Sequence, residues 1–226
     1  MKKIAILIVG DVRDCYAKDL LKASLCDFDI FIGSYNKHES YLKDFGKVNF
    51  MKLIQPNEIR LPHNIAKEKY QQKMLQFLHI DNIIKNFNDK LNEYDYIFKF
   101  RFDIVLHTNV PYKDYIYSLA KEIKERTLYN DSDKFFFCTT QTFLKLFHDF
   151  YDNIIRLTHS TIENYDGSFE YSWKAEPSFK QNAILKNIEF KRYTMMSIIR
   201  GTYNKKVGDG NRKLYDKNDK LQGKFQ

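Results

Sequence analysis

The stretch "YDYIFKFRFDIVL" (residues 94–106) decides how the rest of the chain can fold. Its aromatic and β-branched residues predict a strand for the interior, yet it carries Lys99, Arg101 and Asp103, and charged side chains are rarely buried unless they are paired. Side chains alternate across a strand, so the aromatic residues are expected on one face and these charges on the other. Two interpretations are open. The strand is half exposed and forms ion pairs with its neighbours, or it enters a polar cleft where Arg101 and Asp103 meet a ligand.

Apolar strand-like segments alternate with helical patterns on both sides of this stretch. Strands are expected at residues 3–9, 28–35, 48–54, 95–106, 134–138 and 188–195, and helices at 14–26, 66–91, 111–124, 140–156 and 177–187. This alternation predicts an α/β fold with a mostly parallel mixed sheet flanked by helices. We expect a single domain over residues 1–200, followed by a basic C-terminal tail over 201–226.

The composition narrows the class of protein. With 43% hydrophobic and 16% aromatic residues the chain does not resemble a disordered protein. No apolar run approaches the ~20 residues that a membrane helix needs, and the apolar start of the chain is interpreted as a first strand. The three cysteines have no motif spacing, and their odd number argues against a disulfide framework, so a cytoplasmic location is expected.

The net charge of +8 is concentrated at one end of the chain. Residues 180–226 contain 12 Lys and Arg against 4 Asp and Glu, whereas the residues before them are neutral overall. Such an end favours an anionic partner: a nucleotide phosphate, an anionic membrane surface or nucleic acid. The alternative is a solvated tail without a partner.

Candidate binding residues follow the first strand. In sheets of this class ligands bind outside the carboxyl ends of the strands. Gly10 lets a backbone approach a ligand closely, Asp11 can accept hydrogen bonds from a ribose or a base, and Arg13 can bind a phosphate through two N–H groups. The alternative is a helix start, with an aspartate as its cap.

Five segments in this order resemble a known family: "GDVR", "DIFIGSY", "QQKMLQFLHIDNII", "YDYIFKFRFDIVL" and "AEPSFKQNAIL". The chain resembles bacterial glycosyltransferase-like proteins of lipopolysaccharide and capsule gene clusters, which have a GT-A fold. The resemblance covers residues 3–200. It implies an enzyme that transfers a sugar from a nucleotide diphosphate sugar to a glycan or lipid-linked acceptor, in the cytoplasm or peripherally at the inner membrane face.

The resemblance also implies how Arg101 and Asp103 are used. Enzymes with a GT-A fold usually carry Asp-x-Asp at this place, whose carboxylates hold Mn²⁺ or Mg²⁺ on the diphosphate. Here Arg101 replaces the first aspartate, and arginine does not ligate a metal. Two alternatives follow: Asp103 binds the metal with help from diphosphate oxygens, water and His107 or a C-terminal residue, or Arg101 neutralises the diphosphate and no metal is needed.

Two further residues receive roles from the resemblance. Glu176 directly precedes Pro177, which favours the first position of a helix, so a capping role is one interpretation. The resemblance implies that an acidic residue here lies near the acceptor, so Glu176 could act as the general base, with the neighbouring Glu170 and Tyr171 as alternatives. Arg200 and the lysines beyond it are expected to close over the diphosphate or to touch the membrane.

A rival hypothesis is a non-catalytic basic protein that binds nucleic acid or another polyanion. The basic C-terminal end supports it. Against it, the aromatic residues lie in core-like segments and are not interleaved with the basic residues, as a stacking surface for bases would require. We therefore expect a nucleotide diphosphate sugar and not nucleic acid as the partner.

Overall fold

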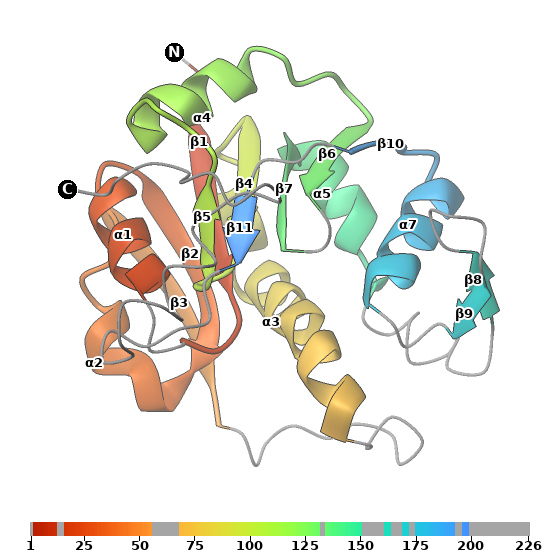
Figure 1. The fold of residues 1–226 in the computed structure, drawn as a ribbon, viewed down its shortest axis with the longest axis horizontal. Helices are drawn as coiled ribbons and strands as arrows, with labels where there is room; N and C mark the ends of the chain where they lie inside the picture. Colours follow the sequence, from red (N-terminus) through yellow and green to blue (C-terminus); the bar gives the residue numbers. More distant parts are fainter. Residues whose placement is uncertain are drawn as a thin grey trace, which may run out of the picture.

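A central sheet of seven strands, flanked by helices, forms the body of the protein (Figure 1). The computed structural model describes residues 2–12, 16–55, 68–131, 134–150, 161–163, 169–171, 175–192 and 196–198. In spatial order the strands are β10 (Glu189–Arg192), β6 (Thr127–Asp131), β7 (Phe135–Thr139), β4 (Tyr96–Phe100), β1 (Ile4–Val9), β2 (Asp29–Tyr35) and β3 (Val48–Ile54).

The sheet is mixed and mostly parallel, as the sequence predicts. β3, β2, β1 and β4 run parallel to one another, and β10 runs parallel to β6. β7 alone is antiparallel to its two neighbours, β4 and β6. The chain is therefore an α/β protein in which six strands of this sheet present their carboxyl ends at one edge.

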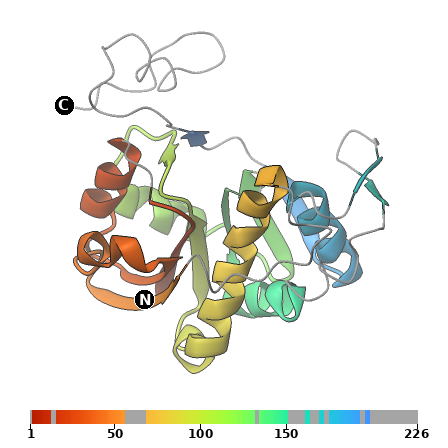
Figure 2. The ribbon, with the colours of Figure 1, turned by 90° about the horizontal axis from the view of Figure 1, so that it is seen from below.

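Helices cover both faces of the sheet because the strands are apolar on both sides. One face packs against α1 (Tyr16–Ser24), α2 (Glu39–Leu42) and α4 (Tyr112–Ala120), and the other against α3 (Glu68–Leu91), α5 (Thr140–Phe147) and α7 (Ala175–Leu185). Figure 2 shows these two groups of helices on opposite sides of the strands. Phe98 and Phe100 face the first group, whereas Ile97 shares a core with the second, which confirms the predicted alternation of β4.

The charge of Lys99 is buried between β4 and α3. Its Nζ donates a hydrogen bond to Gln76 Oε1 at 2.9 Å and lies 5.6 Å from the centre of the Phe136 ring. On the other side of β1, α3 packs closely on β2. The contact is so close that a Cβ added at Gly33 would lie 2.8 Å from His79 Cβ. These two contacts hold α3 across β1.

The prediction of one continuous strand over residues 95–106 is wrong. β4 ends at Phe100, and the chain turns before β5 (Ile104–Leu106), which pairs antiparallel with β11 (Met196–Ile198) in a separate small sheet. The turn is stabilised by an ion pair between Arg101 and Asp103, while Phe102 remains buried and packs edge-on against Phe45 at 5.9 Å. Alternation along a sequence does not reveal such a break, because the aromatic side chain between the charges stays in the core.

Other segments differ from the prediction as well. The sequence pattern predicted neither β6 nor the antiparallel pair of β8 (Thr161–Glu163) and β9 (Phe169–Tyr171). The helix expected at 140–156 is described as α5 and ends at Phe147. The tail, 201–226, lies outside the described residues. None of the described helices has the length and apolar character to cross a bilayer.

Candidate functional site

The carboxyl end of β1 is a topological switch point of the sheet. From β1 the chain proceeds to β2 and β3 on one side, whereas β4 lies on its other side. The connections that leave β1 and β4 therefore diverge, and ligands of open α/β sheets bind at such a switch point. The register aligns Ile8 with Phe100 and Val9 with Gly33, so Gly10, Asp11 and Arg101 all follow strand ends at this edge.

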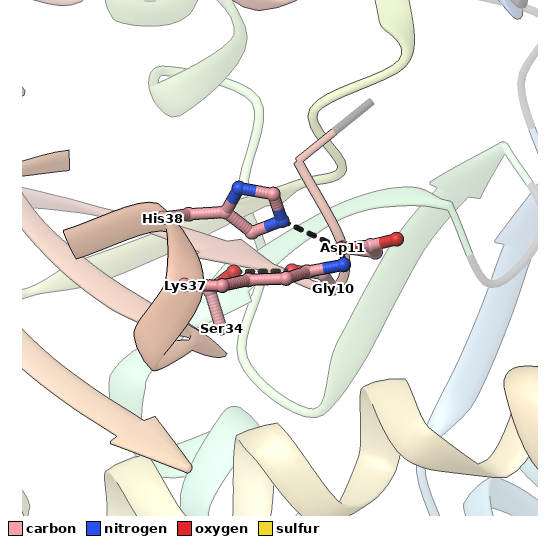
Figure 3. A network of polar contacts seen from close by, with 5 residues as sticks. All are labelled: Gly10, Asp11, Ser34, Lys37 and His38. Atoms are coloured by element: carbon pink, nitrogen blue, oxygen red, sulfur yellow. Dashed lines mark hydrogen bonds and ion pairs between the residues drawn. The ribbon is translucent and has the colours of Figure 1, made fainter. Parts of the chain in front are cut away.

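Gly10 has a backbone conformation that a side chain would strain. Its φ is +117°, a value that residues with a Cβ rarely adopt. Its N–H donates to the carbonyl of Gly33 at 2.9 Å. Its carbonyl accepts from Ser34 Oγ at 2.7 Å, a contact drawn in Figure 3. A Cβ at Gly10 would meet no atom of the described residues within 4 Å. The backbone is thus fixed beside open space, which is the arrangement that the close approach of a ligand needs.

Asp11 joins the ends of β1 and β2 through a polar cluster, drawn in Figure 3. Its Oδ1 lies 2.8 Å from His38 Nε2 and 3.1 Å from Lys37 Nζ. Partial burial disfavours the charged carboxylate, but the hydrogen bonds from His38 and Lys37 outweigh it and hold the pKa of Asp11 below its ordinary value. Asp11 is therefore ionised at neutral pH. Both contacts engage Oδ1, and among the described residues Oδ2 remains available to a ligand from the half-exposed side.

Arg101 and Asp103 meet each other in the turn after β4. Arg101 Nη2 lies 2.6 Å from Asp103 Oδ2, and the side chains are 18% and 2% exposed. The pair explains why the stretch 94–106 can carry Arg101 and Asp103 beside the core: the two opposite charges neutralise each other. Arginine has five N–H donors, and the contact with Asp103 runs through Nη2, so the partly exposed guanidinium retains donors for an anion.

The described residues do not fit a divalent metal at Asp103. One of its carboxylate oxygens is occupied by a guanidinium, which would repel a cation held on the same group. His107 follows the end of β5, and within the described ranges no three His, Cys, Asp or Glu side chains gather in a way that could hold a metal ion. We therefore derive no step through a metal.

The remaining predicted site residues are not placed. Arg13 and Arg200 lie outside the described residues. Glu176 lies in the first turn of α7, as its place beside Pro177 predicts, but its side chain is outside the described part of the chain. The roles given to these residues remain predictions.

The sequence analysis missed Lys37 and His38, which bind Asp11. Like Gly10, these residues can be found from their position directly after a strand. The segment "NKH" follows β2, which is parallel to β1, so its polar side chains lie at the same edge of the sheet.

His79 was missed as well, and it lies beside this cluster. The side chain is fully buried, and neither ring nitrogen has a hydrogen-bond partner among the described residues. Its ring packs edge-on against Tyr35 at 5.1 Å, and Lys37 Nζ lies 5.5 Å from the centre of that same Tyr35 ring. Burial lowers the pKa of His79 to about 4, although the charge of Asp11 acts in the opposite direction. The imidazole is therefore neutral at physiological pH.

No protein-family model matches this chain, and a search of curated proteins finds no relative.

Proposed function

We propose that the protein is a glycosyltransferase that moves a sugar from a nucleotide diphosphate sugar to a glycan or lipid-linked acceptor. The observation that carries the proposal is a topological switch point where Gly10, open on its Cβ side among the described residues, and Asp11 follow β1 while Arg101 follows the neighbouring strand β4. A nucleotide diphosphate needs an acceptor for its ribose or base and a cation for its phosphates, and this edge supplies both.

Asp11 is the group proposed for the nucleoside. Lys37 and His38 fix its carboxylate through Oδ1, so it does not have to lose side-chain freedom when a ligand binds. The other oxygen can accept hydrogen bonds from the two ribose hydroxyls or from an N–H group of a base. A hydrogen bond to a charged group is stronger than one between neutral groups, which suits the anchoring end of the donor.

Arg101 is the group proposed for the diphosphate. In the transfer, an acceptor hydroxyl attacks the anomeric carbon of the sugar, the bond from that carbon to the diphosphate oxygen breaks, and the nucleoside diphosphate leaves with the electron pair. Arg101 would stabilise the negative charge that develops on the leaving oxygen. Asp103 positions the guanidinium through the 2.6 Å ion pair. The proton of the acceptor hydroxyl passes to a general base, for which Glu176 remains the candidate.

Release of nucleotide from donor sugars tests the proposal. The purified chain is incubated with UDP-, GDP- and CDP-activated sugars, with and without an extract of bacterial glycolipids as acceptor, and the liberated nucleotide is quantified. We expect one donor class to be consumed faster when acceptor is present. The absence of turnover, together with salt-sensitive binding of a random oligonucleotide, would instead support the rival polyanion-binding protein.

A further inference from the structure

Two large apolar side chains are exposed side by side at the end of α7. Ile184 is 56% and Leu185 is 65% exposed. Within the described residues, the other large apolar side chain of comparable exposure is Val110, at 50%, in the loop before α4. Isolated exposed apolar residues are common on protein surfaces, but adjacent ones on one helix end form a patch that needs an explanation.

This patch lies in the basic part of the chain. Residues 180–192 contain four basic residues and one acidic residue: Lys180, Lys186, Lys191, Arg192 and Glu189. Lys180 precedes Ile184 by one helical turn and Lys186 directly follows Leu185, so basic side chains border the apolar pair on both sides. The sequence that continues from β10 is also basic, whereas residues 1–179 have no net charge.

We propose that the end of α7, together with β10, is a docking surface for an anionic membrane. Ile184 and Leu185 would enter the boundary between headgroups and acyl chains, and the bordering lysines would contact lipid phosphates. Aliphatic side chains between basic residues suit lipid better than nucleic acid, whose bases stack on aromatic side chains. The charge of the segment selects an anionic surface over a neutral one.

The surface is separate from the candidate donor site. β10 is the edge strand of the sheet, and four strand-to-strand steps lead from it to β1, which corresponds to about 19 Å at ~4.8 Å per step. Figure 1 shows α7 and β10 at the end of the molecule opposite α1 and α2. A membrane bound at this end would leave the edge at Gly10 and Asp11 accessible to a water-soluble donor. The inference does not depend on the donor chemistry.

Co-sedimentation of the full chain with vesicles tests this surface. The vesicles contain phosphatidylcholine alone or phosphatidylcholine with phosphatidylglycerol. We expect binding to the anionic vesicles only, and a loss of at least about tenfold in affinity for the double variant Ile184→Gln/Leu185→Gln, since each buried apolar side chain contributes strongly to partitioning. Val110→Gln is the matched control and should bind as the parent protein does.

Charge reversal provides the second arm. Lys186→Glu should weaken binding to anionic vesicles by about tenfold or more, because each basic residue near the surface contributes to the attraction. Lys121→Glu, after the end of α4, changes the net charge equally and should have little effect. Melting curves and nucleotide titrations of all variants check that neither folding nor donor binding has changed.

Three results would overturn the inference. The double variant Ile184→Gln/Leu185→Gln could bind vesicles as well as the parent protein does. The parent protein could bind neutral vesicles as well as anionic ones, or it could bind a random oligonucleotide and no vesicle. If nucleotide binding fails in the parent protein while vesicle binding follows the expected pattern, the docking surface stands and the proposed function does not.

Discussion

Arg101 and Asp103 form a 2.6 Å ion pair in the turn that separates β4 from β5. The pair is asymmetric, because Asp103 is almost fully buried while Arg101 keeps some contact with solvent. Arg101 therefore supplies a positive charge beside a buried carboxylate, and its own exposed part is placed to meet an anionic ligand. The same guanidinium would then support the turn and bind the diphosphate.

The first prediction concerns this pair. Arg101→Met should reduce the free energy of unfolding by ~3–5 kcal/mol, because it leaves a buried carboxylate without its counter-charge. The double variant Arg101→Met/Asp103→Leu should recover much of that loss, since it removes both charges. Chemical denaturation of both single variants and the double variant gives the coupling energy. Additive losses would mean that the two side chains do not interact in solution.

The second prediction concerns the titration of His79. Its pKa of about 4 in the folded protein lies below the unfolded value of 6.5, so the unfolded state binds the extra proton first. Stability should therefore fall as the pH drops from about 6.5 to about 4, by an amount on the order of 3 kcal/mol for this group. His79→Phe, which keeps an aromatic contact with Tyr35, should be less sensitive to pH over this interval. Identical pH profiles for the two proteins would show that His79 is not buried in neutral form.

The third prediction concerns the close contact between β2 and α3. Gly33→Ala would place a Cβ 2.8 Å from His79 Cβ and 3.1 Å from the His79 carbonyl oxygen, so the backbone of α3 must move. We expect a loss of ~1–3 kcal/mol in stability and faster amide exchange in the middle of α3. Ser34→Ala, at the next residue, removes one hydrogen bond to Gly10 and should leave exchange in α3 unchanged. Unchanged stability of Gly33→Ala would contradict the packing described here.

The fourth prediction concerns the general base. Glu176→Gln should lower the rate of sugar transfer ~10²-fold or more, as expected for removal of a general base, and should leave donor affinity unchanged. The exposed Glu189, in β10, provides a control, and Glu189→Gln should retain activity. Single-turnover rates and donor titrations separate the two effects. A normal rate in Glu176→Gln would assign this residue to the start of α7 and not to the reaction.

Local sequence patterns predicted most of the sheet. The unbroken apolar run at 3–9 corresponds to β1, and the alternation of aromatic residues along β4 gave the correct faces for Phe98 and Lys99. Both predictions succeed because the burial of a strand determines its sequence pattern. A strand buried on both faces is continuously apolar, and side chains that face opposite ways alternate along the sequence. β6 was missed because "TLYND" is short and half polar, and its burial arises from neighbours that are distant in sequence.

The candidate site was only partly predictable. Gly10 and Asp11 follow from the rule that ligands bind at carboxyl ends of parallel strands, and the same rule applies to Lys37 and His38 once the second strand is placed. The pairing of Arg101 with Asp103 is a property of the turn, and an alternation pattern cannot reveal it. His79 is one polar residue in a long helix, and its relation to Tyr35 exists only after α3 packs across the sheet.

The binding of nucleoside diphosphates tests the central claim most directly. Calorimetric titrations of the parent protein, Asp11→Asn and Asp27→Asn with UDP, GDP and CDP compare the proposed nucleoside ligand with an exposed aspartate that pairs with Lys113 away from the site. We predict that the parent protein and Asp27→Asn bind one of these nucleotides equally well, and that Asp11→Asn binds it at least about tenfold more weakly, as for the loss of a hydrogen bond to a charged group. Equal affinities of the two variants, or no binding of any of the three nucleotides by the parent protein, would contradict the assignment of this edge of the sheet as a nucleotide site.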